Sequence, residues 1–168
     1  MELLQGVFTE MIAGLVGIFV GTLAALAVER FKERRRNRHR ARTILRALAQ
    51  ELEENQRTLR AVRPAYTQTA FGKSFYVATI AWETAQAGGD LPAIIGVELA
   101  DTIAAQYALL VRIRYYVDLL TRLWFAPADI PGYDDIRGGF HRSILETMAQ
   151  AIGNFPVLQG MIERALRG

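Results

Sequence analysis

The feature that most constrains this chain is an apolar run that passes directly into a cluster of arginines. Met11 to Val28 contains no charged residue, and about 18 helical residues rising roughly 1.5 Å each would cover about 27 Å. The hydrocarbon core of a bilayer is about 30 Å thick, so the run predicts one transmembrane helix. We expect that helix to continue as a stalk to about Arg63.

Charge is distributed unevenly along the chain. Met1 to Val28 carries two acidic residues and no basic one, whereas Glu29 to Arg42 carries eight basic and two acidic residues, a net charge of +6. Thr43 to Gly168 has twelve basic and thirteen acidic residues and is nearly neutral. Basic residues that flank a span stay in the cytoplasm. We therefore expect a single-pass protein of the inner (plasma) membrane, with its N-terminus outside and its body in the cytoplasm.

A cleaved signal peptide is the main alternative to a permanent span. Ala25-Leu26-Ala27 offers the small-x-small pattern of a cleavage site. However, a signal peptide carries its positive charge before the apolar run, and here the order is reversed. The sequence therefore favours the permanent span.

The basic cluster is typical of a segment that lies among lipid headgroups. Lysine and arginine side chains next to a span reach lipid phosphates and fix the topology. Basic runs also bind nucleic acids, but no nucleic-acid recognition fold accompanies this one. We expect membrane lipids and no nucleic acid as partners. The predicted lipid contacts are Arg30, Lys32, Arg34, Arg35, Arg36 and Arg38.

Small residues recur on related faces of the predicted span. Gly17, Gly21 and Ala25 follow one another at intervals of four, and Gly14 lies on a related face. Such spacing lets a second helix approach closely in lipid, although glycine is common in spans in any case. The pattern predicts packing against another transmembrane protein or a second copy of this chain.

A second pattern follows the arginines and predicts a helix that packs lengthwise on another helix. Its residues are spaced by threes and fours, as in a coiled-coil seam, and the partner is a second chain or the chain's own later helices. The one polar member, Asn55, either fixes the register of the seam or bonds to a neighbouring loop. The seam consists of Leu45, Leu48, Leu52, Asn55, Leu59 and Val62.

The remainder predicts further helices and no strand. Pro64 is expected to end the stalk helix, because a proline disfavours helical geometry in the residue before it. The fold class is all-α: a single N-terminal transmembrane helix continuous with a cytosolic antiparallel bundle, divided at about 1–28, 29–63 and 64–168. The expected later helices are Phe75–Ala87, one capped by Asp90 with Pro92 in its first turn and ending near Leu123, Ile136–Asn154, and Val157–Arg167 after Pro156.

The connection from Trp124 to Asp135 is too apolar for a simple solvated loop. We expect it to fold back on the bundle or to dock on a partner, through Trp124, Phe125, Ile130 and Tyr133. Its three acids, Asp129, Asp134 and Asp135, follow no fixed cation-binding pattern.

Three short stretches are similar to a pattern in one group of proteins. Glu51-Leu52-Glu53-Glu54-Asn55, Thr79-Ile80-Ala81-Trp82 and the turn from Gly89 to Leu91 resemble uncharacterised prokaryotic single-span membrane proteins with a small helical cytosolic domain. The resemblance implies this architecture and no particular activity.

Motifs that carry chemistry are few. The chain has no cysteine, and Thr67 stands where a phosphate-binding loop ending in Gly72-Lys73-Ser74 would need a glycine. His39 and His141 belong to no metal-binding motif, and we expect His141 to be structural. We expect no enzyme, cofactor or metal site. Two functions remain: a scaffold or accessory subunit of a larger membrane complex (energy-converting, photosynthetic or transport), or a signalling or defence protein whose stalk transmits a conformational change.

Overall fold

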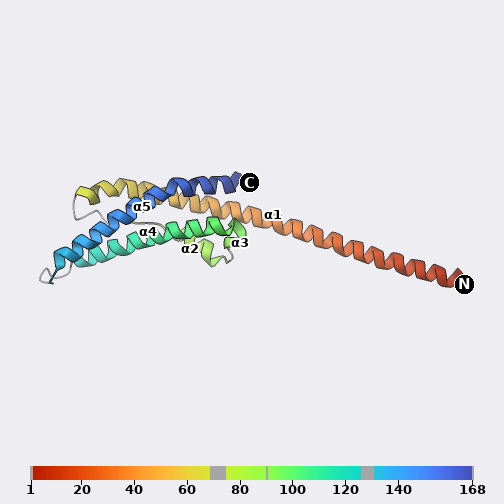
Figure 1. The fold of residues 1–168 in the computed structure, drawn as a ribbon. Helices are drawn as coiled ribbons and strands as arrows, with labels where there is room; N and C mark the ends of the chain where they lie inside the picture. The colour runs from red at the N-terminus through yellow and green to blue at the C-terminus, as the bar shows by residue number, and fades with distance from the viewer. Residues whose placement is uncertain (1, 69–74, 90, 126–130, 168) are drawn as a thin grey trace. The chain divides into compact units, whose positions relative to one another are not determined.

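The computed structural model describes residues 2–68, 75–89, 91–125 and 131–167, with side chains from residue 21 onward. These residues form five helices: α1 (Glu2–Gln68), α2 (Ile80–Ala87), α3 (Leu91–Ile95), α4 (Val97–Trp124) and α5 (Tyr133–Arg167) (Figure 1). The described residues contain no strand, and the all-α prediction is confirmed.

Two compact units divide the chain, and each is described by itself. The first unit, Met1–Arg40, consists of the first part of α1, and its side chains from residue 21 onward are all exposed. The second unit, Ala41–Gly168, holds the rest of α1 together with α2 to α5. The boundary between the units falls inside the stalk predicted for residues 29–63.

The second unit is a helical bundle built around the apolar faces of its three long helices. Leu48 of α1, Ile103 and Ile113 of α4, and Ile144 and Met148 of α5 have no solvent exposure. Within each helix the buried residues recur at intervals of three and four, so each helix turns one stripe toward the shared core. This arrangement confirms the prediction of a helical bundle, although not all of its long helices are antiparallel.

α1 and α4 run in the same direction through the bundle, and α5 runs back. Glu51 of α1 contacts Tyr107 of α4, whereas Tyr66, about four turns later, contacts His141 near the start of α5. Both α1 and α4 therefore run toward the end of the bundle at which α5 begins, as Figure 1 shows for the second unit. Residues 78–81 return along α1, since Ala78 bonds to Asn55 and the later Ala81 bonds to the earlier Glu51.

Two prolines that were expected to end or restart helices lie inside helices instead. α1 continues past Pro64 to Gln68, and α5 continues through Pro156 to Arg167. A proline removes one backbone hydrogen bond of a helix, at a cost of about 3 kcal/mol in the interior. Apolar burial beyond each proline offsets that cost, because Tyr66 and Leu158 are each only 1% exposed.

The second expected helix begins later than predicted. Residues 75–79 are not helical, and α2 starts at Ile80 instead of Phe75. Both the backbone N–H and the C=O of Ala78 bond to the side chain of Asn55, which occupies the groups that a helix would use. A side chain distant in the sequence has replaced the local helical hydrogen bonds.

The third expected helix is broken in two by a glycine. Gly96 has a φ of +89° and separates α3 from α4. A positive φ is accessible to glycine at little cost and interrupts helical geometry. Gly89, at φ +84°, lies in the predicted stop after α2, and α5 begins at Tyr133, three residues before the expected Ile136.

The predicted span is not shown by the structure. In the described part of the chain, no helix combines the length and the apolar character that crossing a bilayer requires. The structure describes no side chains for residues 11–20, which form more than half of the predicted span. The transmembrane segment stays a prediction.

Candidate functional site

The most polar place inside the second unit is a buried carboxylate that joins α1, α2 and α4. Glu51 on α1 is 8% exposed. Its Oε1 accepts a hydrogen bond from the Tyr107 hydroxyl at 2.6 Å, and its Oε2 accepts one from the backbone N–H of Ala81 at 2.8 Å. A buried carboxylate needs such donors to offset its lost hydration.

Glu51 caps the start of α2 from a different helix. Ala81 is in the first turn of α2, where the backbone N–H groups have no partner within the helix. A negative charge at this end of a helix is also favourable to the helix dipole. Nearby, the buried Thr79 donates its hydroxyl to Glu83 at 2.7 Å. The start of α2 is therefore held by side chains.

Asn55, one turn after Glu51, holds the segment that precedes α2. Its Nδ2 donates to the C=O of Ala78 and its Oδ1 accepts from the N–H of Ala78, both at 2.8 Å. Of the two interpretations of Asn55, these bonds fit a residue that bonds to a neighbouring loop. Glu51 and Asn55 lie on one face of α1 and together hold residues 78–81.

Tyr107 completes the site through its ring and its hydroxyl. The Trp82 ring stacks on it with centroids 5.0 Å apart and an interplanar angle of 11°. Burial raises the pKa of Tyr107 well above its usual value of 10, and the hydrogen bond to Glu51 and the charge of that carboxylate raise the pKa further. Tyr107 therefore stays protonated and acts as a hydrogen-bond donor.

A second polar contact joins α5 to the end of α1. His141 Nε2 lies 2.5 Å from the carbonyl oxygen of Tyr66, and because a carbonyl can only accept, the histidine nitrogen donates. The Tyr66 and His141 rings stack with centroids 6.1 Å apart, and the Phe75 ring meets the Tyr66 ring edge-on. Burial raises the pKa of Tyr66. His141 thus helps to hold the last turn of α1.

The predicted helix seam lies in the core of the second unit. Its leucines are at most 2% exposed, Asn55 is buried, and Val62 is partly buried. The four leucines belong to one apolar cluster with residues of α4 and α5, and Val62 packs against that cluster. The seam of α1 is thus covered by helices of the same chain.

The predicted docking loop is only partly described. Trp124 ends α4, and Phe125, which follows it, is 81% exposed. Tyr133 begins α5 and donates its hydroxyl to the carbonyl of Leu123 at 2.7 Å. Ile130 and Asp129 lie outside the described residues, and Asp134 pairs with Arg137 at 3.3 Å.

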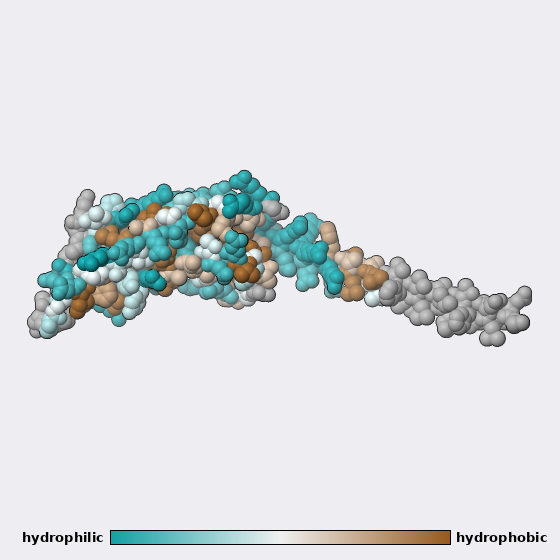
Figure 2. All heavy atoms as spheres, in the orientation of Figure 1, coloured by the Kyte–Doolittle hydropathy of each residue, from teal (hydrophilic) through white to brown (hydrophobic). Residues whose placement is uncertain are grey.

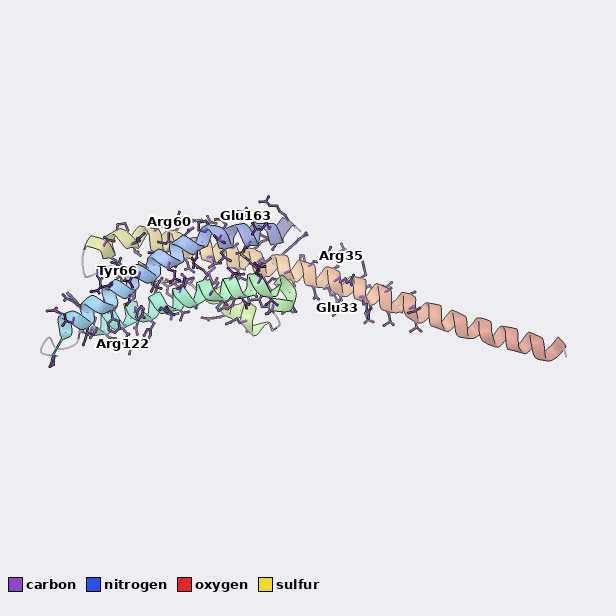
Figure 3. The ribbon with its side chains drawn as sticks, in the orientation of Figure 1. Glu33, Arg35, Arg60, Tyr66, Arg122 and Glu163 are labelled. Carbon is purple, nitrogen blue, oxygen red and sulfur yellow. The ribbon has the colours of Figure 1, made fainter. Side chains whose placement is uncertain are left out.

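The first unit carries the predicted lipid and span contacts. All six basic side chains from Arg30 to Arg38 are exposed, and Figure 3 labels Arg35 on this helix. Ala25 is exposed, and a Cβ placed on Gly21 would meet no atom within 4 Å. Gly14 and Gly17 belong to residues 2–20, for which the structure describes the helix but not the surroundings of each residue.

No other constellation of chemical groups stands out among the described residues. In that part of the chain, no group of three or more His, Cys, Asp or Glu side chains could hold a metal ion. Gly72, Lys73 and Ser74 are not among the residues that the structure describes.

The pairing of Glu51 with Tyr107 was not predicted from the sequence. The available signal was Glu51 and Asn55, two polar residues one helical turn apart beside the apolar seam.

Comparison with models of protein families, with curated proteins and with solved structures finds no match to this chain.

Proposed function

We propose that this protein is a membrane-anchored, non-enzymatic scaffold or accessory subunit of a larger integral-membrane assembly. The observation that carries the proposal is the surface of the first unit, where exposed apolar side chains directly precede exposed basic ones. Leu23, Leu26 and Val28 are each at least 50% exposed, and Phe31 is 69% exposed. Figure 2 shows this apolar patch followed by a hydrophilic stretch.

Lipid accounts for both parts of that surface. Exposed apolar patches mark sites that a membrane or a partner covers. The basic residues from Arg30 to Arg38 would lie among the phosphates, where each contributes about 1 kcal/mol near an anionic surface. The apolar sequence from Met11 onward supplies the remainder of the proposed span. We place the second unit in the cytoplasm, on the side that the basic residues favour.

The inside of the second unit supports a scaffolding role for the body. Glu51, Asn55 and His141 all use their polar atoms to bond helices and loops of the same chain. These three side chains therefore hold the bundle together from the inside. The outer faces of its helices would be the surfaces that contact partners. The assembly would be of the energy-converting, photosynthetic or transport kind.

The anchor is tested by extraction of membranes with alkaline carbonate. We expect the protein to stay in the membrane pellet, and a tag at its carboxyl end to be accessible only after the cells are opened. Release into the carbonate supernatant, or labelling of the tag on intact cells, would contradict the proposal. Replacing Leu23, Leu26 and Val28 by Ser should shift the protein toward the supernatant, whereas Tyr76→Ser, an exposed change in the second unit, should not.

The scaffold role is tested by purification in mild detergent. A stoichiometric complex with other membrane proteins would support it, and mass spectrometry would identify them. The alternative role in signalling or defence is favoured by one observation, the unbroken helix from Glu2 to Gln68, which could carry a rearrangement along its length. An oligomer that changes state with a ligand would favour that role. An unresponsive, isolated monomer would contradict both.

A further inference from the structure

The outer face of α4 carries a second regular pattern, opposite to its buried face. The buried stripe of α4 includes Ile103, Leu110, Ile113 and Val117. On the other side, eight positions of α4 and the residue after it follow one another at alternating intervals of four and three, and all are exposed except Ala104, which is intermediate. They are Val97, Asp101, Ala104, Ala108, Val111, Tyr115, Asp118, Arg122 and Phe125.

This spacing is the seam of two helices that pack lengthwise. A helix on the surface of a bundle normally turns charged and polar residues to the solvent. Six of these nine positions are apolar instead, and the large ones are strongly exposed: Val97 by 64%, Val111 by 51% and Tyr115 by 58%. The pattern indicates that another helix covers this face.

The three charged positions decide which helix fits and in which direction. In a parallel pair of identical helices each seam residue faces its own copy, so the charges of Asp101, Asp118 and Arg122 would all meet like charges. In an antiparallel pair centred near Val111, Arg122 instead faces the partner's Asp101. We propose that α4 packs antiparallel against α4 of a second copy of this chain, around a two-fold axis near Val111.

Side-chain sizes fit the same alignment. The Tyr115 ring falls opposite the partner's Ala108, Phe125 falls opposite the partner's Val97, and Val111 meets the partner's Val111 at the axis. Small residues at positions 104 and 108 allow the backbones to approach closely. Arg122 is already held on this face by an ion pair with Asp118, at 2.9 Å. All residues of this interface belong to the second unit.

Cysteine crosslinking of the full chain in mild detergent tests the pairing, because the natural sequence has no cysteine. Val111→Cys should form a disulfide dimer by itself. Ala108→Cys and Tyr115→Cys should crosslink when the two variants are mixed and poorly when each is alone. Two copies of position 108 would be about 10 Å apart along the axis, and a disulfide needs Cα atoms within about 7 Å. Ala149→Cys, an exposed position on α5, is the control and should not crosslink.

Exchange of the charges gives an independent test with the same readout. In the Val111→Cys background, Asp101→Arg or Arg122→Asp alone should lower the crosslinked fraction several-fold, and the two together should restore it. Crosslinking of Ala108→Cys with itself would show a parallel pair and overturn the proposal. Absence of Val111→Cys crosslinks in a folded, helical protein would overturn it too. Association through the span alone would give neither the Val111→Cys crosslink nor its rescue by the charge exchange. A negative result in both tests would therefore contradict the α4 pairing without contradicting the membrane anchor.

Discussion

Glu51 shows how a single buried charge is made compatible with an apolar core. Its two oxygens accept from Tyr107 and from the N–H of Ala81, at 2.6 and 2.8 Å. Hydrogen bonds to charged groups contribute about 1.5–3 kcal/mol each, and removing one partner exposes the full desolvation penalty of the other. The site therefore stabilises the bundle only while both donors are present.

Replacing Tyr107 by Phe should destabilise the second unit by about 2–3 kcal/mol, because the ring packing stays while Glu51 loses one of its donors. Chemical denaturation of the full chain, followed by circular dichroism, measures the change in the free energy of unfolding. Tyr76→Phe is the matched control, since Tyr76 is 60% exposed and its loss of a hydroxyl should change stability by less than about 0.5 kcal/mol. Equal effects of the two variants would show that the Glu51 contact contributes nothing.

Stability should also fall at alkaline pH through the same residue. The pKa of Tyr107 is raised in the folded protein, while in the unfolded chain tyrosine ionises near pH 10. Above pH 10 the unfolded chain therefore loses a proton that the folded chain keeps, and the free energy of unfolding decreases as pH rises. Tyr66 acts in the same direction. Tyr107→Phe should flatten the decline measured between pH 9 and 11, and an unchanged slope would contradict this account.

At the scale of elements, α2 depends on contacts from α1. It has only eight residues, too few for an isolated helix to persist in water. Asn55→Ala removes both bonds to Ala78 while the apolar core stays intact, so residues 78–87 should open locally more often. Hydrogen exchange should show faster exchange there with little change in α4. Gln50→Ala, which removes only an exposed bond to Glu54, should leave exchange unchanged.

Two glycines should respond to alanine with opposite signs. Gly96 has a φ of +89°, so an added Cβ is strained although no atom lies within 4 Å, and Gly96→Ala should destabilise by about 1–2 kcal/mol. Gly153 is exposed inside α5 with equally open space, and Gly153→Ala should stabilise by about 0.5–1 kcal/mol. Thermal unfolding compares them. Destabilisation by both variants would contradict the assignment of Gly153 to a regular helix.

Local patterns predicted the long helices better than their ends. The apolar spacing of the seam in α1 and of the buried stripe in α4 continues along each helix as far as other helices cover it. Pro64 and Pro156 were expected to interrupt helices, but both lie inside helices. Burial of apolar residues after each proline outweighs the local cost of the proline. Asn55 bonds to the backbone of Ala78, 23 positions later, and keeps that residue out of a helix. Patterns among neighbouring residues cannot predict a contact over that separation.

At the scale of the whole molecule, the core could be anticipated and the polar site could not. The seam from Leu45 to Val62 is apparent from spacing alone, and the bundle covers it together with Tyr66 of the same helix. Glu51 and Tyr107 are 56 positions apart, and their pairing depends on the register between α1 and α4. That register follows from the packing of the complete bundle, which includes the break at Gly96 that local patterns missed.

The predicted span contact and the α4 interface use different residues, so each can be tested by itself. A Cβ placed on Gly21 meets no atom within 4 Å in the described part of the chain, so the space beside it is open to a second helix. We expect Gly17→Leu together with Gly21→Leu to weaken association within the membrane several-fold, measured by crosslinking at a cysteine introduced near residue 10, because the bulk keeps a second helix away. Crosslinking at Val111→Cys should be unchanged. Val28→Leu, which adds little bulk at the end of the apolar run, serves as the control. If association is unaltered after the double glycine replacement, the predicted span contact is wrong.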